Sequence, residues 1–135
     1  MCTKNNGTNG NEDTQVLNSG DYCDYIELYN SSDHDIDISG YGITDDRYDI
    51  FKGIVPSGSI VPAKGFFIIY CAKSDEMYAV FGLSSDGETV RLTSTDGIMI
   101  DEVQVPALTA DTCYARNEDG GKSFAVLAPT PQKSN

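Results

Sequence analysis

The stretch Asp24-Tyr25-Ile26-Glu27-Leu28-Tyr29-Asn30 decides the fold of this chain, together with the run from Ile36 to Asp46 that follows it. In the first stretch the apolar Ile26 and Leu28 alternate with other residues, which is the period of a strand with two different faces. The second run also alternates, and Gly40 interrupts it where a strand can bend or bulge. Two such runs joined by a polar corner predict consecutive strands of a β-sheet.

Short strand-like runs separated by turn residues continue through the rest of the chain. Phe66–Cys71 is apolar on both faces, which predicts a central strand covered on each side. Residues 75–81 could form one helical turn or an irregular crossover, and helix is otherwise nearly absent. Strands of this length at a spacing of about 10 residues predict an all-β sandwich or barrel.

Two hairpins are predicted by Asp-Gly turns. The first joins residues 89–93 to residues 98–105 through Asp96-Gly97, and the second joins residues 112–116 to residues 123–126 through Asp119-Gly120. In the first hairpin Val90 and Leu92 alternate with polar residues and should face the core. The candidates to lie opposite them are Ile98, Ile100 and Val103.

The chain is strongly acidic. Its 135 residues fit one domain, and 21 acidic against 9 basic residues give a net charge of −12. Nucleic acid is therefore not an expected partner, because binding it depends on Lys and Arg that neutralise phosphates. The same charge disfavours a general attraction to anionic lipid surfaces. No apolar run approaches the roughly 20 residues that cross a bilayer as a helix.

The four cysteines lie far apart in the sequence and form no C-x-x-C pair. They lack the tight spacing of zinc knuckles. We expect Cys71 and Cys113 to be buried as free thiols, in preference to a disulfide among Cys23, Cys71 and Cys113.

Residues 1–20 are rich in Asn, Gly and Thr and are expected to form a flexible polar tether, followed by one domain over residues 21–135. Cys2 opens this segment and is similar in position to the lipid-carrying cysteine of a bacterial lipoprotein. A lipid on Cys2 would be the only link to a membrane. The alternative is a cytosolic protein with a disordered tail.

From Asp24 to Asn135 the chain resembles the lamin tail domain family. Residues 24–30 match the D-W-I-E-L-Y-N strand of that family, with Tyr25 in place of the usual Trp. Further matches follow in order, namely Ile38-Ser39-Gly40-Tyr41, Thr44-Asp45-Asp46, Pro62-Ala63-Lys64-Gly65, residues 83–92, Tyr114-Ala115-Arg116 and Pro129-Thr130-Pro131. The sequence departs from the family at its opening I-N-E strand, where only Gly10-Asn11-Glu12 stands at a suitable distance.

This resemblance implies an immunoglobulin-like β-sandwich with Greek-key-type connections. It also implies a non-catalytic interaction or scaffolding module, displayed on a bacterial cell surface or secreted, with a protein of the cell envelope as its partner. We expect no enzyme activity and no cofactor. The alternative function is a carbohydrate-binding module that uses exposed Tyr side chains and acidic loops, with or without calcium.

Candidate functional residues fall into two groups. Glu27 and Arg116 lie mid-strand, and we expect them to form a structural ion pair, because a half-buried carboxylate needs a partner. Aromatic and acidic residues beside polar loops form the candidate interaction surface, and these are Tyr22, Tyr41, Asp45, Asp46 and Tyr48.

Two catalytic or metal-binding patterns fail on inspection of the sequence. Asp33, Asp35 and Asp37 alternate like the start of a calcium loop, but the sixth and twelfth positions are not Gly and Glu. The single histidine, His34, lies in a hydrophilic corner and is expected to be solvated rather than aligned with a serine. The sequence thus predicts no catalytic and no metal-binding residues.

Overall fold

The computed structural model describes residues 2–3, 24–71 and 81–135. These residues form strands and no helix, and every strand pairing is antiparallel. The strands are β1 (Cys2–Thr3), β2 (Asp24–Tyr29), β3 (Ile36–Asp37), β4 (Gly42–Thr44), β5 (Gly53–Ile54), β6 (Ile60–Val61), β7 (Phe66–Cys71), β8 (Glu88–Thr93), β9 (Met99–Val105), β10 (Thr112–Arg116) and β11 (Phe124–Leu127).

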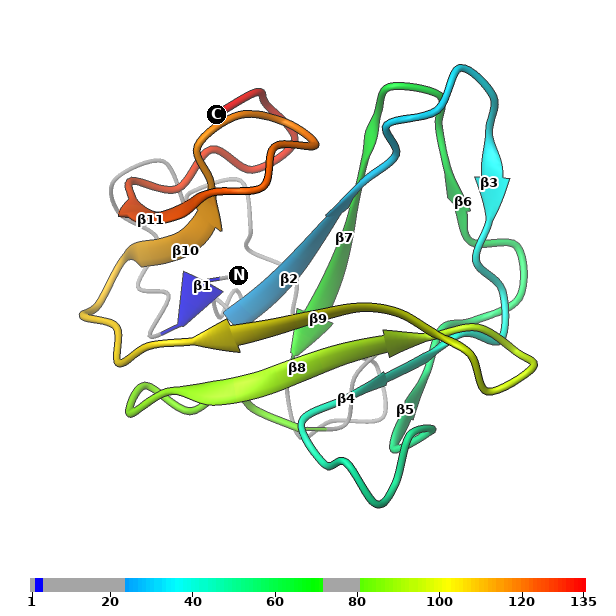
Figure 1. The fold of residues 1–135 in the computed structure, drawn as a ribbon, viewed down its shortest axis with the longest axis horizontal. Helices are drawn as coiled ribbons and strands as arrows, with labels where there is room; N and C mark the ends of the chain where they lie inside the picture. Colours follow the sequence, from blue (N-terminus) through cyan, green and yellow to red (C-terminus); the bar gives the residue numbers. More distant parts are fainter. Residues whose placement is uncertain (1, 4–23, 72–80) are drawn as a thin grey trace, which may run out of the picture.

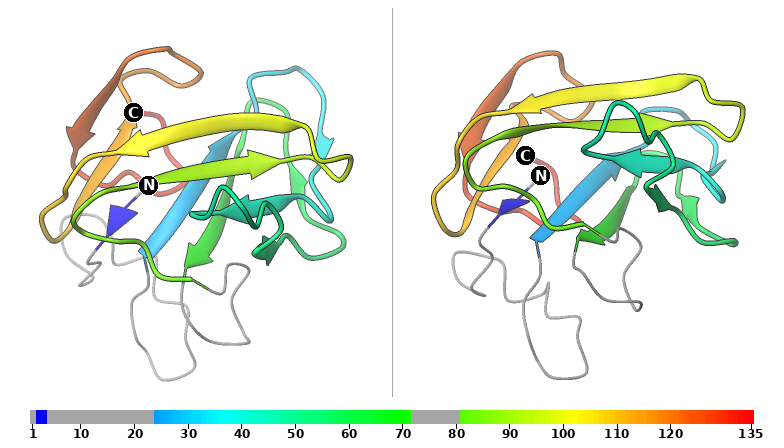
Figure 2. Two further views of the ribbon diagram at one scale, coloured as in Figure 1. Left: turned by 60° about the horizontal axis from the view of Figure 1, so that its bottom comes forward. Right: turned by 90° about the horizontal axis from the view of Figure 1, so that it is seen from below.

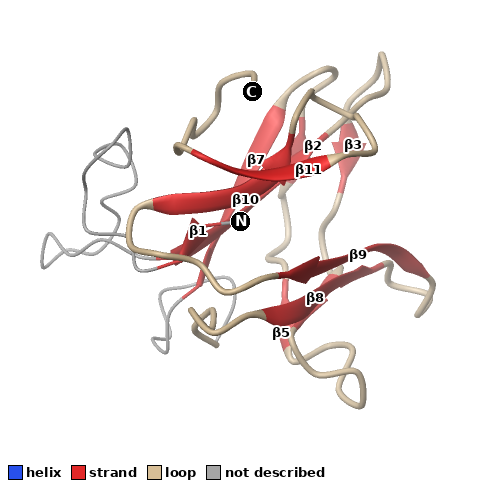
Figure 3. Cartoon of the chain, turned by 60° about the vertical axis from the view of Figure 1, so that its left-hand side comes forward, coloured by secondary structure: helices blue, strands red, loops and turns tan. Residues whose placement is uncertain are grey.

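Two sheets pack face to face. One has the order β11-β10-β1-β2-β7 and the other the order β5-β4-β8-β9, while β3 and β6 form a short separate pair. Figure 1 shows β8 and β9 side by side near the lower end of β2, the left view of Figure 2 shows them crossing over β2, and Figure 3 separates the two layers. The prediction of an all-β, immunoglobulin-like sandwich is confirmed.

The main core lies between these two sheets. Ile26 and Ile69 from the five-stranded sheet meet Ile43, Val90 and Leu92 from the four-stranded sheet, and all five are buried. The alternation of β8 therefore places Val90 and Leu92 where the sequence predicts them.

A second, smaller cluster covers the opposite face of the five-stranded sheet. It contains Tyr25, Ile68 and Cys113, with Tyr70 packed against it. Strand β7 accordingly has buried residues on both faces, as its apolar sequence predicts. The prediction that it is a central strand is wrong, because β7 ends the hydrogen-bonded order of its sheet and pairs only with β2 among the described strands.

The predicted positions of Ile98 and Ile100 opposite Val90 and Leu92 are also wrong. The register of the β8–β9 hairpin shifts between Leu92 and Thr93, so that Ile100 is the extra residue of a bulge. Ile98 lies in the turn before β9. The exposed fractions are 63% for Ile98, 57% for Met99 and 54% for Ile100. We call these three residues the apolar tip.

Two predicted segments fall mainly outside the described residues. Cys2 and Thr3, at the start of the predicted tether, form β1, and the remainder of residues 1–20 lies outside the description. The same holds for the predicted helical turn, of which only Phe81 is described.

Candidate functional site

The loop of residues 45–52 carries three of the predicted interaction residues. The backbone of this loop crosses β4 at Gly42, where a Cβ atom would lie 2.2 Å from the carbonyl oxygen of Ile50. Glycine is therefore required there for close approach of the two segments. The loop consequently folds back against β4 before it leads into β5.

Polar contacts fix the acidic side chains of this loop. Lys52 Nζ lies 2.6 Å from Asp45 Oδ1, and this hydrogen-bonded ion pair raises the pKa of Lys52. Asp46 Oδ1 accepts a hydrogen bond from the backbone N–H of Tyr48 at 2.8 Å. The two carboxylates thus have defined local partners that hold the loop in shape.

A shallow groove with a volume of about 470 Å³ lies along this loop. Asp45, Asp46 and Tyr48 line it together with residues of β8. The side chain of Tyr48 is 82% exposed, and the guanidinium of Arg47 lies 4.5 Å from the centre of its ring. Tyr48 therefore offers an aromatic surface to solvent on the side away from Arg47.

The other two predicted surface tyrosines do not join this groove. Tyr41 is half-buried and packs against the main core. Tyr22 lies outside the described residues. The structure therefore brings together Asp45, Asp46 and Tyr48 and separates Tyr41 from them.

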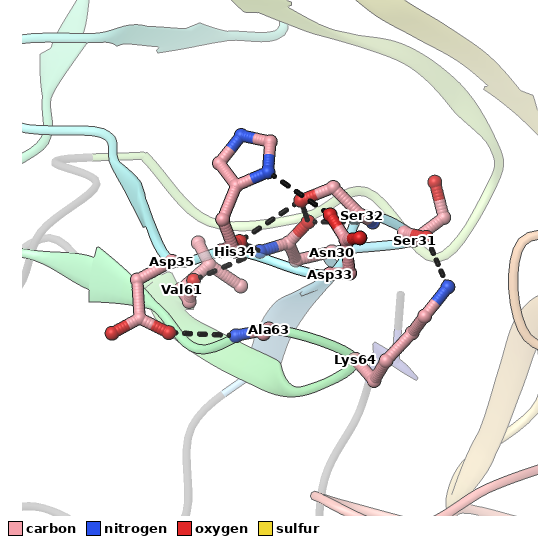
Figure 4. A network of polar contacts seen from close by, with 9 residues as sticks. All are labelled: Asn30, Ser31, Ser32, Asp33, His34, Asp35, Val61, Ala63 and Lys64. Carbon is pink, nitrogen blue, oxygen red and sulfur yellow. Dashed lines mark hydrogen bonds and ion pairs between the residues drawn. The ribbon is translucent and has the colours of Figure 1, made fainter.

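The corner that contains His34 is organised by Asn30 (Figure 4). Asn30 is 4% exposed, and its Nδ2 donates to the carbonyl oxygens of His34 at 2.8 Å and Val61 at 3.1 Å. Its Oδ1 accepts from the backbone N–H and the hydroxyl of Ser32. This buried amide joins the end of β2 to β6, a role that its position at the end of the E-L-Y-N motif did not reveal.

The acidic residues around His34 make local hydrogen bonds. Asp35 Oδ1 accepts from the N–H of Ala63 at 2.9 Å, and Asp37 Oδ1 accepts from the N–H of Ser39 at 2.8 Å. Hydrogen bonds from Ser39 lower the pKa of Asp37. The side chain of His34 is 74% exposed and lies 3.4 Å from Asp33. In the described ranges, no three His, Cys, Asp or Glu side chains gather closely enough to hold a metal ion.

Glu27 does not pair with Arg116, and the predicted structural ion pair is wrong. Glu27 lies on the same face of β2 as Tyr25, whose hydroxyl is 3.6 Å from the sulfur of Cys113 on β10. Arg116 is three residues beyond Cys113 and therefore points to the opposite face of the sheet. The sequence could not show this, because it does not reveal the register between β2 and β10.

Each of the two residues has another partner. Glu27 Oε2 accepts a hydrogen bond from the backbone N–H of Gln132 at 2.6 Å. Arg116 faces the other sheet, where it donates to Asp101 Oδ2 at 2.9 Å, and it also donates to the carbonyl oxygen of Gly121 at 2.6 Å. Glu27 thus anchors the C-terminal segment, whereas Arg116 connects the two sheets.

Burial raises the pKa of Glu27, and the charge of Asp119 acts in the same direction. The folded state therefore binds the Glu27 proton more tightly than the unfolded state. Its contribution to stability is present at low pH and is lost as the pH rises from the ordinary Glu value of 4.5 through the raised folded value. We expect Glu27→Gln to become steadily more stable relative to the wild type over this rise.

Urea unfolding of both proteins at a series of pH values measures this difference. The matched control is Glu118→Gln, which removes an exposed carboxylate from the turn between β10 and β11. A difference between Glu27→Gln and wild type that does not change with pH would contradict the prediction.

The prediction of free thiols is correct for Cys71 and wrong for Cys113. Cys71 carries a buried thiol that forms no disulfide, whereas Cys113 is disulfide-bonded. Cys113 is 4% exposed and packs with Tyr25 and Ile68. The sequence could not show this bond, because the four cysteines are far apart in the chain.

Among the described residues, no helix is long and apolar enough to cross a membrane.

Comparison with curated proteins and with solved structures gives no significant match. The family model of the Lamin Tail Domain matches residues 4–107, which is most of the chain. This family consists of immunoglobulin-like, non-catalytic domains. The match agrees with the two-sheet fold, and the chain therefore belongs to the lamin tail domain family.

Proposed function

We propose that this chain is a non-catalytic protein-interaction module that works outside the cytoplasm, at a bacterial cell surface or in the secreted fraction. The apolar tip is the observation that carries the interaction role. Three consecutive large apolar side chains, Ile98, Met99 and Ile100, each expose more than half of their surface. Contiguous exposed apolar groups rimmed by polar residues are typical of protein interfaces.

The position of the tip strengthens this argument. β9 is the last strand in the order of the four-stranded sheet, so its outer edge is open to a partner in the described structure. Polar groups border the tip, since Arg91 on the neighbouring strand pairs with Glu102 of β9 at 2.6 Å. An apolar centre with a polar rim is the usual composition of a protein–protein interface.

The disulfide at Cys113 supports the proposed location. Disulfides persist in secreted and surface proteins and are rare in a reducing cytoplasm. A lipid on Cys2 is one way to retain the domain at the envelope. The backbone of Cys2 lies in β1, beside Cys113 of β10.

A photo-crosslinking amino acid at position 100 tests the proposal in cells. We expect it to capture one protein reproducibly from the envelope or culture fluid, and Ile100→Lys should reduce the binding of that protein by at least about tenfold. The matched control carries the crosslinker at the exposed Ser57, in another loop. Equal capture from both positions, or none from position 100, would contradict the interaction role of the tip.

Glycan binding is the second candidate, favoured by the exposed ring of Tyr48 beside two carboxylates in the groove. Aromatic side chains beside polar groups suit sugar rings, and acidic loops can bind calcium. Saturable binding of a wall polysaccharide that Tyr48→Ala abolishes, and that Ile100→Lys leaves unchanged, would establish this function instead.

A further inference from the structure

Lys52 and Asp45 form an ion pair at the neck of the loop that joins β4 to β5. Asp45 follows β4 directly, Lys52 precedes β5 directly, and the two strands pair with each other (Figure 1). Lys52 Nζ lies 2.6 Å from Asp45 Oδ1, which is the distance of a strong, charge-assisted hydrogen bond. The side chains of Lys52 and Asp45 are 34% and 21% exposed, so most of each is shielded from water.

An aromatic ring and a second carboxyl group border this pair. Lys52 Nζ lies 5.2 Å from the centre of the ring of Phe81, a residue that is buried. Glu88, the first residue of β8, acts electrostatically on both Asp45 and Lys52, so it lies near them. Glu88 Oε1 accepts a hydrogen bond from the backbone N–H of Ser84, which orients the side chain. One amine and two carboxyl groups therefore meet beside a buried ring.

These groups are the components of amide formation between two side chains. A lysine amine is a nucleophile when it is neutral, and a carboxyl group is attacked more readily when it is protonated. The proton between Lys52 Nζ and Asp45 Oδ1 can pass from nitrogen to oxygen, which makes both groups neutral in one step. Well-oriented groups of one molecule reach effective concentrations of about 10⁵–10⁸ M, which favours condensation over the reverse hydrolysis.

The surroundings act on the protons that this reaction moves. The hydrogen bond to Asp45 raises the pKa of Lys52, so the ion pair is the resting state, while burial opposes this rise. Burial also raises the pKa of Glu88, and the charge of Asp45 acts in the same direction. Glu88 therefore keeps its proton at a higher pH than an ordinary glutamate and can supply it to a departing hydroxyl group.

We propose that Lys52 and Asp45 condense to an isopeptide bond, without an enzyme or a cofactor, and so close the loop of residues 45–52 covalently. Nζ of Lys52 attacks Cγ of Asp45 and forms the new N–C bond. A C–O bond of the carboxyl group then breaks, and that oxygen leaves as water. Glu88 gives a proton to the departing hydroxyl group and recovers one from the nitrogen. No atom is oxidised or reduced, so the reaction needs no further reactant.

The bond would hold β4 and β5 together at the base of the loop that carries the exposed Tyr48. Exposed loops are preferred sites of proteolysis, and Arg47 in this loop is exposed. With the bond in place, a cut after Arg47 leaves the two parts of the chain joined. Such a link suits a domain that works outside the cell. It does not involve the apolar tip, so its absence would leave the proposed interaction role unaffected.

The intact mass of the full chain, measured after reduction of its disulfide, tests the proposal. After prolonged incubation we expect the wild type to be lighter than its sequence by one water molecule. Lys52→Arg is the matched variant, because it keeps the positive charge beside Asp45 but has no nucleophilic amine. It should keep its full mass. Trypsin digestion of the wild type should yield the peptide that ends at Arg47 joined to the peptide that begins at Tyr48.

Substitution of Glu88 tests the assigned proton transfer. Glu88→Gln should slow the loss of water at least about tenfold, because an amide cannot exchange protons in this way. The control is Asp86→Asn, which removes an exposed carboxylate two residues away and should leave the rate unchanged. Thermal unfolding of both variants checks that they are folded before rates are compared. Equal rates in Glu88→Gln and wild type would overturn the role of Glu88.

Two results would overturn the bond itself. The first is a wild-type chain that keeps its full sequence mass after incubation. The second is a loss of water that persists in Lys52→Arg, with no joined peptides after digestion. That result would assign the loss to cyclisation at an Asp-Gly sequence, of which the chain has three, at Asp86, Asp96 and Asp119.

Discussion

Asn30→Ala is expected to lower the free energy of unfolding by about 3 kcal/mol. The substitution removes four hydrogen bonds made by one buried amide. It leaves the carbonyl oxygen of the buried Val61 without its Asn30 donor, and an unsatisfied buried group costs about 1–3 kcal/mol. The corner between β2 and β3 would lose this buried side-chain link to β6. Urea unfolding followed by circular dichroism measures the change.

Asn30→Asp separates the contribution of the hydrogen bonds to stability from the contribution of packing, because the Asp side chain has nearly the same shape as Asn. It retains an acceptor for Ser32 but places a second carboxylate oxygen against the carbonyl oxygens of His34 and Val61. Burial and these carbonyl groups raise the pKa of such a carboxyl group. The stability of the variant relative to wild type should therefore recover as the pH falls and the group is protonated.

Ser31→Ala is the matched control for this corner. Ser31 is exposed, and its backbone carbonyl accepts from Lys64 Nζ at 2.6 Å, which the substitution preserves. We expect a change within about 0.5 kcal/mol. If Asn30→Ala were no more destabilising than Ser31→Ala, the amide would not hold the corner together.

The elements that follow local rules could be predicted from the sequence. The alternation of residues 24–29 and the Asp-Gly turns mark β2 and the two hairpins correctly, because strand period and turn conformation depend on neighbouring residues. Gly97 and Gly120 both have positive φ, as such turns require. The same local rules place Val90 and Leu92 in the core.

Features that depend on pairing between distant strands could not be predicted. The separation of Glu27 from Arg116 follows from the register between β2 and β10, which no local pattern specifies. The bulge at Ile100 is a single inserted residue, and it moves an apolar side chain away from the core. The place of β7 at the end of its sheet is likewise a property of topology rather than of composition.

Reduction of the Cys113 disulfide is expected to lower the free energy of unfolding by about 2–5 kcal/mol, and the midpoint of thermal unfolding by about 10 °C. The bond constrains the unfolded chain, and its sulfur is buried beneath Tyr25 in the small cluster. Thermal unfolding with and without a strong reductant measures the effect. A wild-type midpoint that reductant leaves unchanged would contradict it.

Two substitutions identify the bond. Cys71→Ala removes the free buried thiol and should preserve the full response to reductant, whereas Cys113→Ala should abolish it. Mass spectrometry of the unreduced protein after proteolysis then names the partner of Cys113. A bond to Cys2 would exclude a lipid on that sulfur, because one thiol cannot form both linkages. A bond to Cys23 would leave Cys2 available for lipidation, so this one peptide pair decides whether the proposed lipid anchor at Cys2 is chemically possible.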